Sequence, residues 1–170
     1  MTRHASSYRK TQGEGHDDGR ETPELRFYLS RSADVEAAPS IGPKTAQRLA
    51  TVGVYTVDDL LTATADELAE RLANRRVSGD TIMQWQSQAR LVCMVPGLRG
   101  VDSQILVACG ISDAVQLSQK RPIDLFALVG PFSETSEGER IIRGGKKPSL
   151  EEVTDWISWA QQSRTLTSAA

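Results

Sequence analysis

Apolar residues recur at helical spacing along short segments of this chain. In residues 39–54 (PSIGPKTAQRLATVGV), Pro43 stands where a first helical residue would stand, and the apolar residues after it fall on one face. Gly53 follows, and glycine readily takes the left-handed conformation that ends a helix. The pattern predicts a tight turn at Gly42 and a helix over residues 43–51.

Further helices are predicted where a capping residue precedes an apolar face. Thr64 and Ser149 each begin a capping box, with an acidic residue three positions later, and Ser112 is a further cap. The predicted helices are 43–51, a short one capped by Thr56, 65–73, 79–93 capped by Ser78, 101–108, 113–118, 123–129 and 150–163, with 24–31 as a short helix or lead-in. No segment alternates apolar and polar residues in the manner of a strand. The predicted fold class is all-α.

The apolar pattern is repeated within the chain. Residues 96–111 (PGLRGVDSQILVACGI) align with residues 39–54 at a constant offset of 57, so that Gly110 falls on Gly53. Self-similarity at a fixed offset is the sequence signature of a duplicated structural unit. The turn and helix predicted for the first segment are therefore predicted again for the second.

Beyond these segments the offset becomes 71, and Trp156 falls on Trp85 in the middle of an apolar helical face. The change from 57 to 71 places an insertion in the second copy, at about residues 130–147. We expect two tandem helix-hairpin-helix units, each followed by a longer helix that bears a tryptophan. Repeat one spans about 38–94 and repeat two about 95–163, and both tryptophans are predicted to be core residues.

Composition and charge narrow the possible functions. The 170 residues are 39% hydrophobic and 25% charged, with a formal net charge of −2 and a sequence pI of about 5.7. Residues 38–129 contain nine lysine or arginine residues and nine acidic ones, so a strongly basic nucleic-acid module is not indicated. The polar residues 1–23 are predicted to be a disordered tail, 24–165 the folded domain, and 166–170 a disordered end.

Catalytic chemistry is not predicted. The two histidines, His4 and His16, fall in the predicted tail, and no phosphate loop, zinc spacing or nucleophile with a base is evident. Cys93 and Cys109, without a CxxC motif and among apolar neighbours, are predicted to be buried reduced thiols. No signal-peptide pattern or bilayer-spanning apolar run occurs. We expect a cytoplasmic protein that is not an enzyme, with no metal, no cofactor, no small-molecule substrate and no membrane partner.

Four segments carry a resemblance to a known family. They are SIGPKTAQRL at 40–49, PGLRG at 96–100, LVACGI at 106–111 and PSLEEVTDWI at 148–157. Together they resemble a bacterial domain family of unknown function that is built from two helix-hairpin-helix units and belongs to the helix-hairpin-helix superfamily. The resemblance covers about residues 27–164.

The resemblance implies weak, sequence-nonspecific binding of nucleic acid, with duplex DNA as the partner. Hairpins of that superfamily present backbone amides to one phosphate, and small residues allow close approach. The implied contacts are Ile41, Gly42, Lys44 and Thr45 in the first hairpin, and Leu98, Arg99, Gly100 and Val101 in the second. Both hairpins depart from the usual glycine-x-glycine, because Ser40 replaces the first glycine of one and Arg99 the second glycine of the other.

Two further sets of residues bear on the partner. The insertion is the most basic part of the chain, and four of its residues are candidates for extra phosphate contacts: Arg140, Arg143, Lys146 and Lys147. The alternative function is a protein-interaction or scaffolding module that has lost phosphate binding. Trp159, at the edge of the apolar face of the last helix, would then contact another protein or pack against the N-terminal segment.

Overall fold

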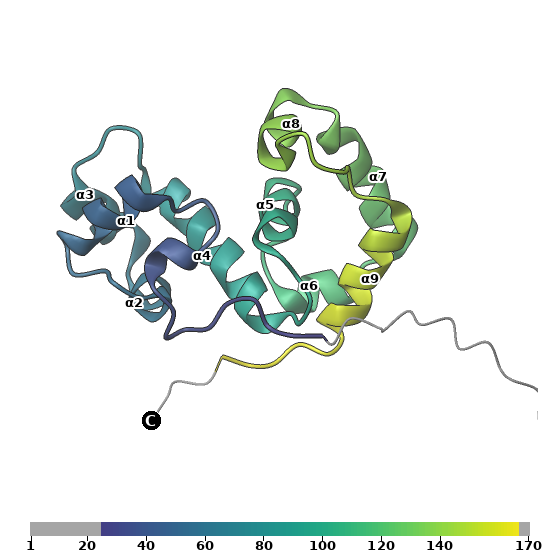
Figure 1. Cartoon of the computed structure of the whole chain (residues 1–170), viewed down its shortest axis with the longest axis horizontal. Helices are drawn as coiled ribbons and strands as arrows, with labels where there is room; N and C mark the ends of the chain where they lie inside the picture. The colour runs from purple at the N-terminus through teal and green to yellow at the C-terminus, as the bar shows by residue number, and fades with distance from the viewer. Residues whose placement is uncertain (1–24, 167–170) are drawn as a thin grey trace, which may run out of the picture.

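The computed structural model describes residues 25–166. Predictions for the tail (1–23) and for residues 167–170 of the predicted disordered end lie outside this range. Within it the chain is all-α, with one short 3-10 helix and nine α-helices (Figure 1). These elements are η1 (Val35–Ala37), α1 (Pro43–Ala50), α2 (Val57–Thr62), α3 (Ala65–Leu72), α4 (Gly79–Met94), α5 (Gly100–Ala108), α6 (Ala114–Ser118), α7 (Pro122–Ser133), α8 (Ser136–Ile142) and α9 (Leu150–Ala160).

The ends of α1 and α5 follow the predicted chemistry. Gly53 has a φ of 84° and Gly110 a φ of 88°, which is the left-handed region that glycine adopts without steric cost. After Gly53, the amide of Val54 donates to the carbonyl of Leu49 over 3.0 Å. The same bond follows Gly110, at 2.9 Å, so the predicted left-handed glycine after the helix is confirmed.

Most predicted caps are present. Thr56 accepts from the amide of Asp59 at 3.1 Å, and Ser149 accepts from that of Glu152 at 3.1 Å. Two details of the capping prediction were wrong. Thr64 precedes α3 but makes no side-chain capping bond, and Asp113 rather than Ser112 caps α6. Carboxylate and hydroxyl caps are nearly equivalent, so two adjacent candidates could not be separated by sequence alone.

Of the two alternatives for residues 24–31, a short helix or a lead-in, the described part, residues 25–31, is a lead-in that places Leu29 in the first hydrophobic cluster. The carbonyl of Arg26 accepts from the amide of Gly97 at 2.8 Å, and that of Arg31 accepts from the amide of Asp58 at 2.8 Å. These carbonyls bond to distant segments instead of to a helical turn. The segment therefore runs as an extended connection, because tertiary hydrogen bonds replace local ones.

Three other boundaries differ from the prediction. Helix α7 runs to Ser133 instead of ending at 129, and α9 ends at Ala160 instead of Ser163. Helix α8 occupies the middle of the predicted insertion, for which no helix was predicted. None of the helices in the described range has the length and hydropathy needed to cross a bilayer.

The helix starts repeat at the spacing found in the sequence. Helices α1, α2 and α3 start at residues 43, 57 and 65, and α5, α6 and α7 start 57 residues later, at 100, 114 and 122. Helix α4 starts at 79 and α9 starts 71 residues later, at 150. Helix α8 is the additional element, and it lies between α7 and α9 in the chain.

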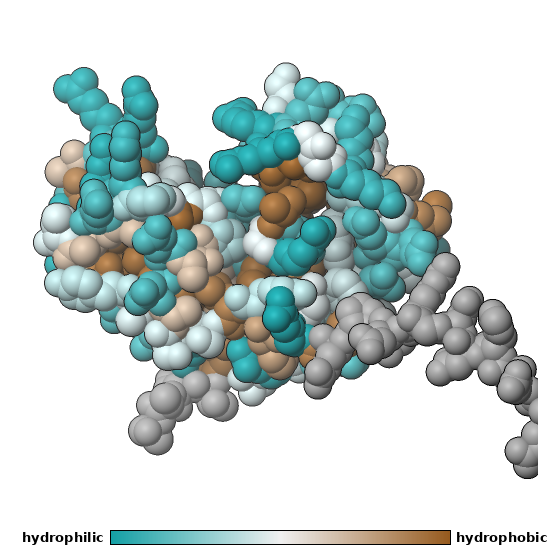
Figure 2. Space-filling model, in the orientation of Figure 1, coloured by the Kyte–Doolittle hydropathy of each residue, from teal (hydrophilic) through white to brown (hydrophobic). Residues whose placement is uncertain are grey.

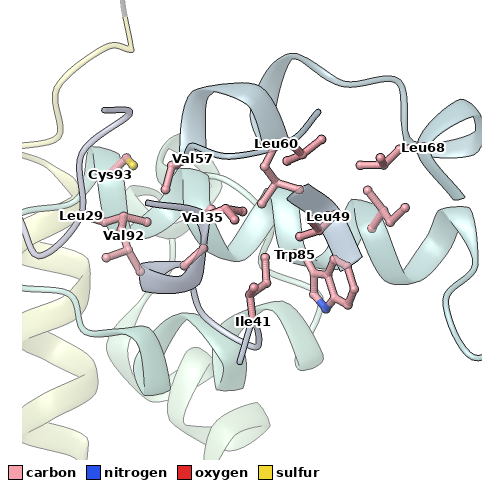
Figure 3. Close-up of a cluster of buried hydrophobic side chains, with 14 residues drawn as sticks. Leu29, Val35, Ile41, Leu49, Val57, Leu60, Leu68, Trp85, Val92 and Cys93 are labelled. Atoms are coloured by element: carbon pink, nitrogen blue, oxygen red, sulfur yellow. The ribbon is translucent and has the colours of Figure 1, made fainter. Parts of the chain in front are cut away.

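Two hydrophobic clusters form the core, and α4 contributes to both. Ile82 and Trp85 of α4 belong to the first cluster, which also contains Leu49 of α1 and Leu60 of α2 (Figure 3). Leu91, near the end of α4, belongs to the second. Figure 1 shows α4 running from the side of α1–α3 toward the side of α5–α9.

The two matched tryptophans are core residues, as predicted. Trp85 is 8% exposed and belongs to the first cluster, whereas Trp156 is 2% exposed and belongs to the second. Leu166, the last described residue, packs against the first cluster. The first residue of the predicted disordered end is therefore in contact with the domain.

Candidate nucleic-acid interface

The turns that precede α1 and α5 share an unusual backbone conformation. Ser40 in the first turn (residues 39–42) has a φ of 66°, and Gly97 in the second turn (residues 96–99) has a φ of 84°. A left-handed conformation is favourable for glycine but costs a residue with a Cβ about 1–2 kcal/mol. The first turn therefore keeps the shape of a glycine turn despite its serine.

The first turn leaves three backbone amides without an acceptor. The amide of Ile41 donates to the carbonyl of Ala38 at 3.3 Å, which removes it from the predicted phosphate contacts. Within the described residues, no acceptor lies within hydrogen-bonding reach of the amides of Gly42, Lys44 and Thr45. These amides belong to the end of the turn and the first turn of α1, where partial positive charge gathers.

The surroundings of the first turn are open and cationic. A Cβ placed on Gly42 would meet no atom within 4 Å, so a ligand can reach the backbone there. Residues 37–57 include Lys44 and Arg48 and no acidic residue. Arg71 of α3 donates to the carbonyl of Val52 at 2.6 Å, which brings a third cation to the far end of α1.

In α5, which follows the second turn, Asp102 occupies the position equivalent to Thr45 of α1. Its carboxylate accepts from the backbone amide of Arg99 at 3.0 Å and from the guanidinium of the same residue at 3.0 and 3.2 Å. The hydrogen bond and charge of Asp102 raise the pKa of Arg99 further above its usual value. Asp102 is 2% exposed, so its negative charge is held inside the N-terminal turn of α5.

The other predicted contacts of the second turn are also limited. The amide of Leu98 donates to the carbonyl of Val95 at 3.4 Å. Gly100 faces the first turn, because a Cβ placed on it would lie 3.4 Å from Cγ of Pro39. Val101 is 39% exposed. The amides of Gly100 and Val101 have no acceptor either, but they follow the Arg99 amide to which the Asp102 carboxylate is bonded. The amides of Gly42, Lys44 and Thr45 have no acceptor and lie in a segment without acidic residues, and we call them the first-turn amides.

The basic residues of the insertion separate into different environments. Lys147 forms an ion pair with Glu134 at 2.6 Å. Arg143 ends α8 in a left-handed conformation, and Lys146 is exposed in the loop that follows. Arg140 of α8 lines a cleft that also includes Ser40 of the first turn. Arg140 is thus the insertion residue that the described structure connects to the first turn.

Trp159 lies against the second turn and the N-terminal segment. A Cβ placed on Gly97 would be 2.9 Å from Cδ2 of Trp159 and 3.0 Å from Cδ2 of Leu25. Trp159 also packs against the second hydrophobic cluster. Trp159 therefore lies on the second turn, where Leu25 of the N-terminal segment also approaches Gly97.

A cleft of about 410 Å³ lies between α4, α5 and α8. Figure 2 shows the surface indented between the regions that Figure 1 labels α1 and α8. Its polar walls are formed by Ser40, Gln84, Gln88, Gln104, Glu137 and Arg140. Sequence analysis did not select the three glutamines, because glutamine on a helix carries no distinctive pattern. The insertion was detectable from the change of offset, but not its role as a wall of this cleft.

Comparison with known families gives one match. Residues 39–163 match a family described as "Domain of unknown function (DUF4332)". No curated protein and no solved structure matches the chain.

Proposed function

Since the match covers most of its length, the chain belongs to the DUF4332 family, and from that premise we propose that it is a non-catalytic tandem helix-hairpin-helix module that binds nucleic acid. Its contact is the phosphate backbone of DNA, held by the first-turn amides and by Lys44. The second hairpin helps to orient the module on the DNA but does not itself bind a phosphate. Binding of this kind carries no base readout and is independent of sequence.

The tandem architecture is supported by three matched features. The helices start at offsets of 57 and 71, and left-handed residues occur at Ser40 and Gly97 in the two turns. Left-handed glycines, Gly53 and Gly110, also follow both α1 and α5. A turn with positive φ before a helix and a glycine after it is what a hairpin and its second helix require.

One observation carries the functional proposal: a buried carboxylate stands beside the amides of the second turn, and none stands at the equivalent position of the first. The first-turn amides have no acceptor and sit beside Lys44 in open space. In the second turn, the buried carboxylate of Asp102 already bonds to the amide of Arg99. The position equivalent to Asp102, 57 residues earlier, is Thr45, which has no negative charge. The amides of Gly100 and Val101 also have no acceptor, so the difference between the two turns lies in the negative charge of Asp102, which disfavours an external anion at the second turn.

A single phosphate site on a nearly neutral protein binds weakly. Non-specific protein–DNA complexes have dissociation constants of about 10⁻⁴ to 10⁻⁶ M at physiological salt, and this module belongs at the weak end of that range. One phosphate contact gives a log–log slope of affinity against salt of about −0.9. The low slope distinguishes one open hairpin from two.

The alternative, a protein-interaction module, has its own observation. Val115 of α6 and Ile123 of α7 are each 61% exposed, and Leu128 of α7 is 48% exposed. A continuous exposed patch of apolar side chains is a common feature of protein contacts, and these three residues are candidates for such a patch. This function becomes the better account if the folded protein does not bind DNA.

Fluorescence anisotropy with a labelled duplex at low salt tests the proposal. We expect weak binding that Lys44→Glu abolishes and that Lys120→Glu, the same charge reversal between α6 and α7, leaves within about twofold. Circular dichroism establishes that both variants are folded. A folded wild-type protein that gives no anisotropy change at low salt rules out the DNA function and leaves the protein-interaction alternative.

A further inference from the structure

We propose that the cleft between α4, α5 and α8 accepts an unpaired nucleobase from the strand whose phosphate the first-turn amides hold. The preferred ligand is then single-stranded nucleic acid, or a duplex with an unpaired base. This inference rests on the proposed function, since it requires a phosphate at the first turn.

The buried side chain of Gln88 provides the main observation. Gln88 is 7% exposed, and its Oε1 accepts a hydrogen bond from the hydroxyl of Ser40 at 2.6 Å. Its Nε2 donates to no group within the described residues. In that range, every side-chain nitrogen or oxygen that is fully buried has a hydrogen-bond partner. The Nε2 group must therefore retain some accessible surface, and Gln88 lines the cleft. A nearly buried amide with unused donors is costly unless a ligand or water satisfies it.

Two other glutamines complete a donor–acceptor surface. Gln104 of α5 uses its Nε2 to donate to Oγ of Ser40 at 2.9 Å, which leaves its Oε1 as an acceptor. Gln84 lies one helical turn before Gln88 on α4 and also lines the cleft. Side-chain amides pair with the edges of nucleobases, whose donors and acceptors stand side by side, as glutamine does with adenine.

The opposite wall supplies a cation. Arg140 of α8 forms no ion pair among the described residues, and neither does Glu137 one turn before it. A guanidinium can stack on a base or pair with the next phosphate, and both contacts tolerate any sequence. The cleft floor includes Val107 and Ile141, and its volume of about 410 Å³ falls within the range of small-ligand pockets, about 300–1,000 Å³.

Continuity with the first turn favours a strand over a free nucleoside. Ser40 lines the cleft and lies two residues before Gly42, so their Cα atoms are at most about 7.6 Å apart. A phosphate at Gly42 and a base beside Ser40 are thus close enough to belong to one nucleotide or to neighbouring ones. A paired base cannot enter such a cleft without leaving its stack.

The test compares a labelled single-stranded oligonucleotide, the duplex of the same sequence, and adenosine monophosphate. We expect the single strand to bind at least about fivefold more tightly than the duplex, as one stacked base would provide. Arg140→Ala should lower the ratio of single-strand to duplex affinity to about one, whereas Arg143→Ala, beyond the cleft residues, should keep the ratio of the wild type. Gln88→Glu, which retains an acceptor for Ser40 but loses the donors, should also remove the preference for the single strand, and Gln84→Ala should reduce it without affecting folding.

The outcomes separate this inference from the function on which it rests. Equal binding of single strand and duplex, both lost in Lys44→Glu, overturns the base cleft and retains the hairpin phosphate site. Competition by adenosine monophosphate at the same concentration as the oligonucleotide overturns the link to a strand. Failure to bind either nucleic acid overturns both proposals.

Discussion

Ser40 and Gln104 are 64 positions apart, yet Nε2 of Gln104 donates a hydrogen bond to Oγ of Ser40 over 2.9 Å. The hydroxyl of Ser40 donates in turn to Gln88 at 2.6 Å. Ser40 thereby joins the first turn to both α4 and α5. This bridging role gives a physical reason for a serine at a left-handed position, where glycine would be less strained.

Substitutions of Ser40 should separate strain from hydrogen bonding. Ser40→Ala loses both hydrogen bonds and keeps a Cβ at positive φ, so we expect a loss of about 1–2 kcal/mol of stability. Ser40→Gly loses the same bonds but relieves the strain, and should be about 1 kcal/mol more stable than the alanine variant. Chemical denaturation measures both. An alanine variant at least as stable as the glycine variant would contradict the left-handed conformation.

Gly97 and Gly53 form a matched pair for measuring the contact with Trp159. Both have a φ of 84°, but a Cβ on Gly53 meets nothing within 4 Å, whereas one on Gly97 lies 2.9 Å from the indole. Gly53→Ala should cost about 1 kcal/mol from backbone conformation alone. Gly97→Ala should cost about 1–3 kcal/mol more, because the side chain also overpacks. Equal melting temperatures for the two variants would show that Trp159 does not lie on the turn.

Asp102→Asn should open the second turn to phosphate. The amide side chain can still accept a hydrogen bond but no longer places a negative charge at the start of α5, and Arg99 loses its ionic partner. We expect a loss of about 1–3 kcal/mol of stability, tighter DNA binding, and a salt slope steeper by about 0.9. Anisotropy at several salt concentrations provides the measurement. Weaker binding by the folded variant would mean that Asp102 does not block the site.

Trp156→Ala tests the second core cluster. The side chain is 2% exposed, and removing a buried tryptophan typically costs about 3–5 kcal/mol from lost burial and the cavity left behind. Chemical denaturation should show this loss for Trp156→Ala and, in the first cluster, for Trp85→Ala. A melting temperature within a degree or two of the wild type would show that the ring is not in the core.

The two thiols should be poorly reactive in the folded protein. Burial raises the pKa of Cys93 and that of Cys109 to about 11, from a usual value of 9.0. A raised thiol pKa means that the thiolate, which reacts, forms only at higher pH. At pH 8 the thiolate fraction should be about 100-fold lower than in the unfolded chain, and alkylation correspondingly slower. Mass spectrometry after iodoacetamide treatment, with and without urea, measures the ratio; similar rates would contradict the burial.

Sequence reasoning located the helices well where caps and turn residues act locally. Pro43, Gly53, Ser78 and Ser149 each mark a helix end through chemistry that involves only neighbouring residues. Residues 25–31 did not follow their apolar spacing, because their carbonyls bond to Gly97 and Asp58, far along the chain. Local patterns cannot report hydrogen bonds that are made only after the chain folds.

The candidate interface was predictable only in part, for a similar reason. The sequence identified both Lys44 and Arg99 as candidates, since each is a cation beside a turn. Their difference arises from Asp102, whose carboxylate is one helical turn beyond Arg99 and folds back onto its amide. The glutamines of the cleft come from separate helices, α4 and α5, and their proximity depends on packing rather than on spacing.

Helix α4 has a consequence for how the protein unfolds. It supplies Ile82, Trp85 and, near its end, Val92 to one cluster, and it supplies Leu91 to the other. Arg164, beyond α9, donates to the carbonyl of Cys93 at 2.8 Å and so joins the end of the described chain to α4 as well. If the helices around one cluster unfold, α4 loses part of its packing, and apolar side chains of the other cluster become exposed. The two halves therefore form one cooperative unit. A fragment that ends before α4 would lack the side chains that α4 supplies to the first cluster.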